Sequence, residues 1–219
     1  MIVSHKYKFI FLRTEKTAST SLSEALYPHL DPKDEIANLK RPAWSKYSAI
    51  HHGALKRTAP KLFGLHPHAT AAQVRSVIGP KIFDSYYTFA VDRDPWERQI
   101  SLYTHRAWKQ DKGPENFDRD MRSFRYRNTE HCRLNNWAVY AIGDEVVVDR
   151  VYDYAQLDEA VADLCTRFAF TDGLEMPRRR QYVAGRPHYS SYYTDYTRDL
   201  VRRWYQREID ALGYEFEEG

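Results

Sequence analysis

The stretch KYKFIFLRTEKTASTSLSEAL, residues 6–26, decides the fold. Residues 9–12 are apolar, which predicts a short buried strand, and the residues after 21 favour a helix. Between them lie Lys16 and five small residues, four of which carry a hydroxyl group. A strand followed by a tight turn and a helix N-terminus presents backbone N–H groups that bind a phosphate-like anion. The sequence therefore predicts an anion-binding turn around Lys16.

This turn differs from the loop that binds ATP in many kinases, because the glycines of GxxxxGK[ST] are absent. The expected donors to the anion are the ammonium group of Lys16 and the hydroxyl groups of Thr17, Ser19, Thr20 and Ser21. Alone, a turn lysine is most often only solvated, so the assignment depends on a second half of the site.

A second strand-to-helix junction lies in FAVDRDPWERQISLY, residues 89–103. An apolar strand at 89–91 ends in polar residues, and Pro95 marks the first turn of a helix. Arg93 stands at the strand end, and Ser101 follows eight residues later, about two helical turns along. Two such junctions, one with a lysine and one with an arginine, suit a ligand that has two separated anionic groups.

KTASTS and RDPWERQISLY together resemble the two signature segments of sulfotransferases that use 3′-phosphoadenosine 5′-phosphosulfate (PAPS). The nearest resemblance is to carbohydrate sulfotransferases of the uronyl 2-O and chondroitin types. KT[AG]xTS alone is a weak signal, but its combination with RxPxxRxxSxY about 75 residues later is specific. The resemblance covers most of the chain outside residues 31–65 and 109–133.

Two positions depart from the family pattern. Glu15 stands where the family usually has proline, and Ala18 stands where glycine is common. The Glu15 carboxylate lies beside an anion site and weakens binding there unless a cation such as Arg13 pairs with it.

The resemblance implies a single α/β domain over residues 1–219, with a P-loop-NTPase-like three-layer fold: a mostly parallel central sheet flanked by helices. The residue pattern agrees, because predicted strands alternate with predicted helices. The apolar run at 146–151 predicts another strand. Periodicity predicts helices at 155–168 and 200–212, the second ending at Gly213.

The resemblance also implies roles for the two junctions. PAPS would be the sulfuryl donor and 3′-phosphoadenosine 5′-phosphate (PAP) the product, with no metal required. Lys16 would stabilise the charge that develops on the leaving phosphate. Arg93 and Ser101 would hold the 3′-phosphate, and Arg186 would reach it from a loop before the last helix. The 5′-phosphosulfate would be held by the first turn, through Arg13, Lys16, Thr17, Ala18, Ser19, Thr20 and Ser21.

Transfer to a hydroxyl group also needs a base for the hydroxyl proton. In uronyl 2-O-sulfotransferases a His-x-His pair lies between the two signatures, and its second histidine is the proposed base. His68 in GLHPHAT matches that histidine, 52 residues after Lys16 and 25 before Arg93. His66 and His52 are alternatives for the same role.

Other branches of the family use a glutamate after the first signature, which makes Glu24 or Glu35 the rival base. The expected acceptor is a carbohydrate hydroxyl, with a small-molecule alcohol or phenol, or a lipid-linked glycan, as alternatives. His52, His66 and Arg178 are expected to contact it, and the basic loop around Arg178 suits an acidic sugar.

Composition and charge limit the classes of ligand and the compartment that we expect. The chain has 219 residues and a formal net charge of +3, which suits an anionic cofactor but falls short of a nucleic-acid binder. Its two cysteines have no metal or redox spacing and favour a reducing compartment. The apolar run at 9–12 is too short for a signal peptide, and no stretch approaches a membrane span. We therefore expect a cytoplasmic enzyme of bacterial type.

Other interpretations remain open at this point. A nucleotide kinase would share the lysine-bearing turn, and a metal-dependent glycosyltransferase could use Asp92 and Asp94 as ligands. Arg93 could serve only as an ion-pair partner of those two aspartates. The histidines of 51–68 could bind zinc, although no thiolate or carboxylate spacing supports this. A binding protein without catalysis would have no need of both Lys16 and a base.

Overall fold

The computed structural model describes residues 1–36, 65–107, 113–128, 132–177 and 187–219. They belong to two compact units, each with its own core. The first unit comprises Met1–Asp92 and Asn136–Pro177, and the second comprises Arg93–Asn135 and Arg178–Gly219. The boundary falls inside the second predicted junction, between a strand end and the helix that follows. The sequence pattern did not indicate this division.

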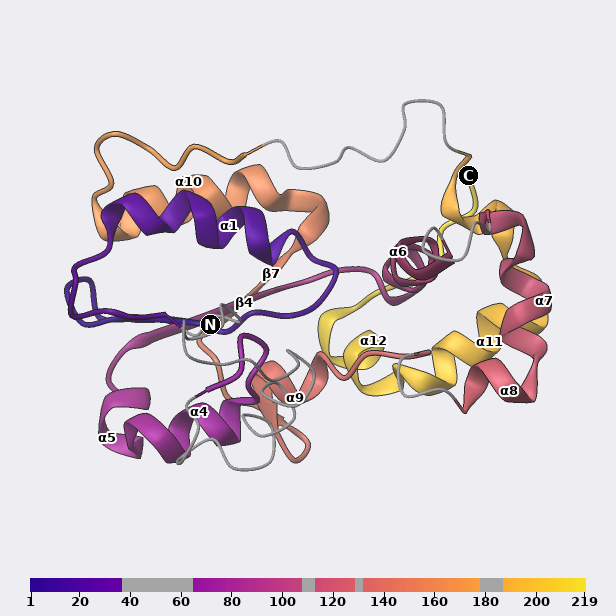
Figure 1. Cartoon of the computed structure of the whole chain (residues 1–219), viewed down its shortest axis with the longest axis horizontal. Helices are drawn as coiled ribbons and strands as arrows, with labels where there is room; N and C mark the ends of the chain where they lie inside the picture. The colour runs from indigo at the N-terminus through magenta and orange to yellow at the C-terminus, as the bar shows by residue number, and fades with distance from the viewer. Residues whose placement is uncertain (37–64, 108–112, 129–131, 178–186) are drawn as a thin grey trace, which may run out of the picture. The chain divides into compact units, whose positions relative to one another are not determined.

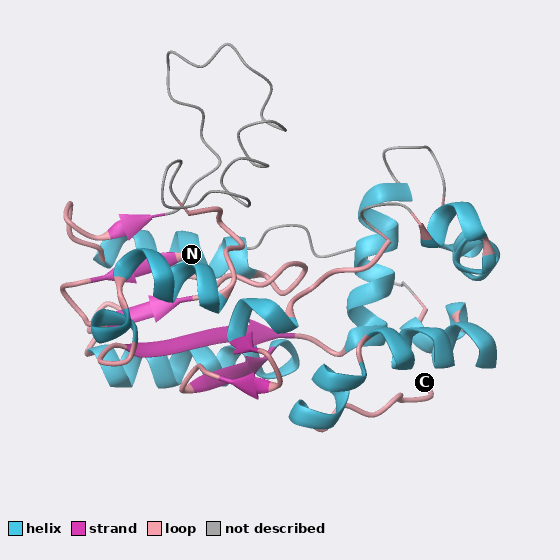
Figure 2. Cartoon of the chain, turned by 90° about the horizontal axis from the view of Figure 1, so that it is seen from below, coloured by secondary structure: helices cyan, strands magenta, loops and turns pink. Residues whose placement is uncertain are grey.

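A five-stranded sheet, in the order β3-β1-β2-β4-β7, organises the first unit, and Figure 2 shows its strands side by side. β2 pairs with β4 and β4 with β7 in parallel, whereas β1 is antiparallel to both β2 and β3. Four of the five strands therefore run in one direction, which confirms the predicted mostly parallel sheet. The strands are β1 (Ile2–Ser4), β2 (Phe9–Phe11), β3 (Glu35–Ile36), β4 (Tyr87–Asp92) and β7 (Arg150–Asp153).

Helices cover both faces of this sheet (Figure 1). On one face lie α1 (Ser19–Leu26) and α10 (Leu157–Phe168), and on the other lie α4 (Ala71–Ile78), α5 (Pro80–Phe83) and α9 (Trp137–Tyr140). The core under α1 and α10 is rich in rings, including Phe11 and Phe89, whose centroids stack 5.0 Å apart. These three layers match the predicted α/β arrangement, while kinship to the P-loop NTPases stays a prediction.

The strand predicted at 146–151 is wrong in its bounds. Val146 closes a small hairpin of β5 (Ala141–Ile142) and β6 (Glu145–Val146), and β7 begins only at Arg150. The reason lies at Asp149, whose carboxylate accepts the Thr88 N–H at 2.7 Å and the Thr88 hydroxyl at 2.8 Å. The chain has to leave the hairpin before it joins β4, so the apolar run is divided between two sheets.

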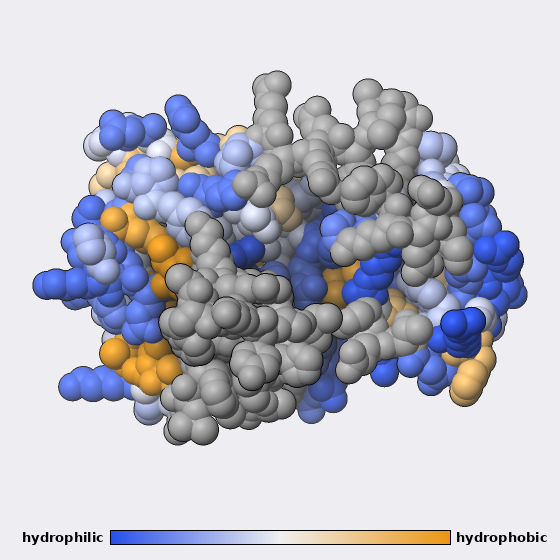
Figure 3. Space-filling view, in the orientation of Figure 1, coloured by the Kyte–Doolittle hydropathy of each residue, from blue (hydrophilic) through white to orange (hydrophobic). Residues whose placement is uncertain are grey.

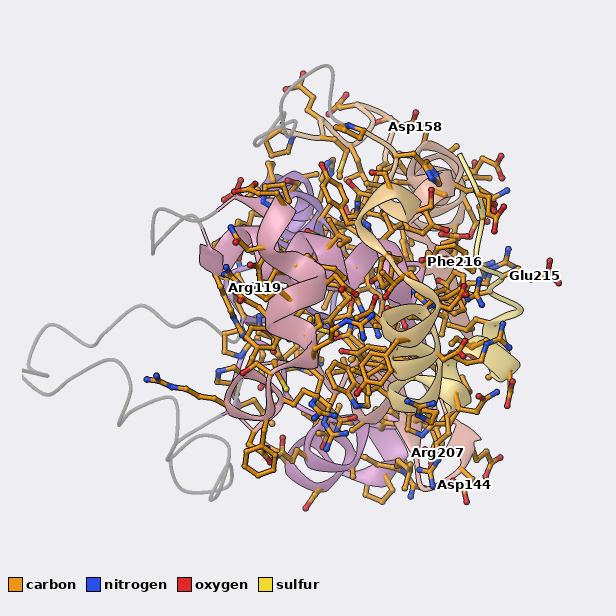
Figure 4. The ribbon with its side chains drawn as sticks, turned by 90° about the vertical axis from the view of Figure 1, so that its right-hand side faces the viewer. Arg119, Asp144, Asp158, Arg207, Glu215 and Phe216 are labelled. Carbon is orange, nitrogen blue, oxygen red and sulfur yellow. The ribbon has the colours of Figure 1, made fainter. Side chains whose placement is uncertain are left out.

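The second unit is helical in its described residues. Its helices are α6 (Pro95–Ala107), α7 (Phe117–Arg122), α8 (Phe124–Arg127), α11 (Asp195–Trp204) and α12 (Gln206–Leu212). Short 3-10 helices add to both units: η1 (Tyr27–His29), η3 (Pro114–Asn116), η4 (Tyr154–Gln156) and η5 (Tyr189–Tyr192). The C-terminal segment closes the core of this unit through Phe216, labelled in Figure 4, whose ring meets Trp96 and Tyr193 edge-on at 5.6 Å each.

The helix predicted at 200–212 is two helices that meet at Tyr205, although it ends at Gly213 as predicted, with φ 72°. Tyr205 donates its hydroxyl to Gln99 at 2.9 Å and accepts the Leu134 N–H at 3.0 Å. Its ring lies 4.7 Å from the guanidinium of Arg98. The break therefore places a buried tyrosine where it can bind three other groups of the unit.

Arg98, the second arginine of the RxPxxRxxSxY signature, is a structural residue of the second unit. It forms an ion pair with Glu208, and the two side chains are 1% and 3% exposed. Removing one partner of such a pair leaves a buried uncompensated charge, which costs about 3–5 kcal/mol. Arg98 in the signature is therefore explained by its contribution to stability. Arg93 and Ser101 are left as the candidate ligand contacts of the signature.

Candidate active site

The turn between β2 and α1 is held in an unusual backbone conformation. Lys16 has φ 66° and Ala18 has φ 54°, so both are left-handed although neither is glycine. Each such residue costs about 1–2 kcal/mol, and strain of this kind persists only where the surroundings impose it. A turn that contains left-handed residues beside a helix N-terminus brings successive N–H groups to one side, which forms an anion-binding concavity.

Buried hydroxyl groups impose this conformation. The Thr14 hydroxyl donates to the Val91 carbonyl in β4, so its contact with the Thr17 hydroxyl at 2.7 Å is one in which Thr17 donates. The Ser19 hydroxyl donates to the Thr14 carbonyl at 2.7 Å. Thr17 and Ser19 are 1% and 4% exposed. Their hydroxyl hydrogens are therefore already donated inside the turn.

The N-terminus of α1 has no side-chain cap. Its N-cap residue, Ala18, has no side-chain acceptor for the N–H groups of the first turn. Thr20 is exposed and accepts a hydrogen bond from the Arg13 guanidinium at 3.0 Å, so its own hydroxyl hydrogen can be donated elsewhere. Ser21 is 8% exposed. The positive end of the helix dipole, Arg13 and Lys16 all lie within this one turn.

Arg13 is partly buried. Burial lowers the pKa of its guanidinium, and the nearby Tyr27 and Glu24 act in the opposite direction. The guanidinium nevertheless stays charged at any physiological pH. It therefore places a positive charge at the start of α1, where its guanidinium donates to Thr20. Pairing of Arg13 with the Glu15 carboxylate stays a prediction.

Two histidines adjoin the turn and have opposite tautomers. His68 Nδ1 lies 2.8 Å from the Arg13 carbonyl, which can only accept, so His68 is protonated at Nδ1. The neutral ring then carries its lone pair on Nε2. His66 Nδ1 accepts the His68 N–H at 3.0 Å, so the neutral ring of His66 carries its proton on Nε2. His68 can therefore take a proton at Nε2, whereas His66 can donate one.

The rival glutamates are placed differently. Glu35 lies in the edge strand β3, is exposed, and has its carboxylate 3.8 Å from His5 Nε2. Strand β1 separates β3 from β2. Glu24 lies in α1 and acts on Arg13 through its charge. Three other predicted residues, His52, Arg178 and Arg186, lie outside the described residues.

Arg93 and Ser101 belong to the second unit. Arg93 pairs with Glu97 one helical turn on, and its side chain is 13% exposed. Asp94 caps α6 by accepting the Glu97 N–H at 2.8 Å, and burial raises the pKa of Asp94 to about 6. Ser101 lies in α6 and is 4% exposed. The sequence indicates Asp92 or Asp94 as the competing ion-pair partner of Arg93, and the structure adds Glu97.

A buried hydrogen-bond network that adjoins the turn was not predicted, although Asp92 was considered from the sequence in other roles. The side chain of Asn136 contacts the backbone of Glu15, and Asp92 and Tyr140 contact each other beside it. No local pattern could reveal this, because Asn136 lies 121 residues from Glu15.

Within the described ranges, no group of three or more His, Cys, Asp or Glu side chains is arranged to hold a metal ion. None of the helices described is both long and apolar enough to cross a membrane.

Comparison with known proteins assigns the class. Residues 1–215 match the model of the sulfotransferase family, and the chain therefore belongs to the sulfotransferase family. Over 108 residues, 48% of this chain, it is also 26% identical to an uncharacterized protein of Archaeoglobus fulgidus, 87% of which is covered. No solved structure matched the chain. The reaction class is thus sulfuryl transfer.

Proposed function

We propose that the chain transfers the sulfuryl group of PAPS to a hydroxyl group of a carbohydrate by in-line displacement. One observation carries the proposal. The ring N–H of His68 is donated to the carbonyl of Arg13, the residue at which the anion-binding turn begins. A histidine with a basic Nε2 is thereby attached to the same backbone that offers N–H groups and cations to a phosphosulfate.

The first unit fits the 5′-phosphosulfate end of the donor. PAPS supplies the activated sulfuryl group. Lys16 and Arg13 provide positive charge, and the N-terminus of α1, which has no side-chain cap, adds backbone donors beside Ala18. Lys16 is the residue proposed to stabilise charge on the leaving phosphate. For the 3′-phosphate we propose Arg93 and Ser101, together with Arg186.

His68 is the proposed base. Its Nε2 accepts the hydroxyl proton while the acceptor oxygen bonds to sulfur and the bond from sulfur to the phosphate oxygen breaks. PAP leaves with the electron pair of that bond. His66, whose Nε2 carries a hydrogen, is proposed to donate a hydrogen bond to the acceptor. Nδ1 is hydrogen-bonded in both rings, so only Nε2 of each ring can act on the acceptor. Nε2 carries a lone pair in His68 and a proton in His66, which favours His68 as the base.

The second unit, taken by itself, exposes side chains of the kinds that bind carbohydrates. Figure 3 shows that the visible surface over α7 and α8 is mostly hydrophilic. Phe124 in α8 is 76% exposed there, and its neighbour Arg125 is also exposed. An exposed aromatic ring suits the apolar face of a sugar, and an exposed guanidinium suits an acidic group. Small alcohols, phenols and lipid-linked glycans remain the alternative acceptors.

The test is a turnover assay with PAPS and a panel of saccharides, alcohols and phenols, read as PAP release. We expect turnover with a saccharide. His68→Ala should lower kcat by about 10²–10⁴, the range for loss of a general base, while PAP affinity stays near that of the wild type. His66→Ala is the matched control, because it removes the neighbouring ring and should cost less.

The pH profile provides the second readout. The acidic limb of kcat/KM should show an apparent pKa in the histidine range, and this limb should vanish in His68→Ala. Near-normal turnover of His68→Ala, combined with an inactive Glu24→Ala or Glu35→Ala, would transfer the role of base to a glutamate and refute our assignment.

A further inference from the structure

A buried amide side chain holds the peptide that precedes Lys16. Asn136 Oδ1 accepts the Glu15 N–H at 2.9 Å, and Asn136 Nδ2 donates to the Glu15 carbonyl at 3.1 Å. Asn136 is 1% exposed. A single side chain thus binds both polar backbone groups of Glu15, as a neighbouring strand would.

The network continues to the end of β4. Asn136 Nδ2 also donates to Asp92 Oδ1 at 3.1 Å, and the Tyr140 hydroxyl donates to Asp92 Oδ2 at 2.7 Å. Asp92 and Tyr140 are both 0% exposed. Only the amide nitrogen can donate to a carbonyl and a carboxylate, and only the amide oxygen can accept an N–H. These contacts therefore allow the amide of Asn136 one orientation.

That orientation has a consequence for Lys16. The Glu15 carbonyl belongs to the peptide that also contains the Lys16 N–H, and the described chain has no cis peptide bond. In a trans peptide the C=O and N–H groups point in opposite directions. Because Asn136 holds the carbonyl, the Lys16 N–H is directed away from Asn136. The left-handed φ of 66° at Lys16 then reverses the chain toward α1.

We propose that Asn136 is a positioning residue for sulfuryl transfer. By holding the Glu15–Lys16 peptide it sets the direction of the Lys16 N–H and the starting point of the Lys16 side chain, and Asp92 holds Asn136 in turn. The inference rests on the proposed function of this turn as the sulfuryl-donor site. It extends that function to a residue outside both signature segments.

The test compares Asn136→Ala with Tyr140→Phe. Tyr140→Phe removes a hydroxyl from the same network but leaves both contacts to Glu15 in place, so it controls for a general loss of stability. For each protein, kcat, the KM of the acceptor and the Kd of PAP are measured below its unfolding temperature. For Asn136→Ala we expect kcat to fall about 10–100-fold and PAP affinity to weaken, with the acceptor KM unchanged. Tyr140→Phe should stay within about threefold of the wild type in all three.

Asn136→Asp replaces the alanine variant if that variant does not fold. It puts an acceptor oxygen where the amide donates to Glu15 and Asp92, and protonation of the new carboxyl restores one donor. Its kcat, divided by that of the wild type at each pH, should therefore rise as the pH falls. A ratio independent of pH would overturn the proposal.

The measurements distinguish the positioning role of Asn136 from the proposed sulfuryl-transfer function. Wild-type values of kcat and PAP Kd in a folded Asn136→Ala overturn the positioning role and leave the proposed function intact. Failure of the wild-type protein to bind PAP overturns the proposed function and this inference with it.

Discussion

Replacing Ala18 by glycine tests the backbone conformation on which the site depends. Ala18 has φ 54° and ψ 16° and serves as the N-cap of α1. A left-handed conformation costs an L-residue about 1–2 kcal/mol, and glycine avoids that cost. Glycine also loses about 0.5–1 kcal/mol more conformational entropy on folding. The balance predicts that Ala18→Gly is about 0.5–1 kcal/mol more stable than the wild type.

The chain offers a matched control. Ala169 has φ 52° and ψ 45° at the C-cap of α10, so Ala169→Gly relieves the same strain outside the turn. Both variants should raise the unfolding temperature by roughly 1–4 °C, measured by calorimetry or by the denaturant midpoint. The hydroxyl network of Thr14, Thr17 and Ser19 should keep the turn folded in Ala18→Gly, so PAP affinity should change by less than about threefold.

The stability change of Ala18→Gly, compared with that of Ala169→Gly, tests whether Ala18 is left-handed. If Ala169→Gly is stabilised but Ala18→Gly is unchanged or destabilised, Ala18 is not left-handed in the folded protein. The concavity around Lys16 would then have to be described differently.

Three further predictions concern charge. Lys16→Ala should lower kcat by roughly 10²–10³ and weaken PAP binding far less, and equal losses in both would show that Lys16 only binds. Arg93→Ala and Ser101→Ala should weaken PAP much more than adenosine 5′-phosphosulfate, which lacks the 3′-phosphate, and equal weakening would refute the assignment. Burial raises the pKa of Asp94 to about 6, above its unfolded value of about 3.9, so the folded chain binds this proton more tightly and stability falls as the pH rises from about 4 to 6. Asp94→Asn keeps a good N-cap and should therefore be about 3 kcal/mol more stable at neutral pH, with the difference lost below about pH 4 in denaturant titrations; a constant difference would contradict the shift.

Local sequence features predicted where several helices and strands begin or end. The apolar run at 9–12 contains β2, Pro95 starts α6, and Gly213 ends α12 with φ 72°. These features depend on burial, on the fixed φ of proline and on the freedom of glycine, all of which are visible in neighbouring residues.

The site itself was predictable only in outline. KTASTS indicated a tight turn before α1, but it could not show that Thr17 and Ser19 use their hydroxyl hydrogens inside the turn. It also gave no sign of Asn136, because that contact spans 121 residues. The prediction of one strand over 146–151 was wrong for the same reason. The hydrogen bond between Thr88 and Asp149 is a tertiary contact, and it divides a locally uniform apolar run between two sheets.

The central claim is that this turn binds the 5′-phosphosulfate end of PAPS. Calorimetric titration of the wild-type chain with PAP, in the presence of a metal chelator, tests it most directly, with ATP and a UDP-sugar titrated in parallel. We predict that PAP binds without metal and that ATP and the UDP-sugar bind far more weakly. Lys16→Ala should still bind PAP. Absence of PAP binding, or binding of ATP or the UDP-sugar as tight as that of PAP, would contradict the account.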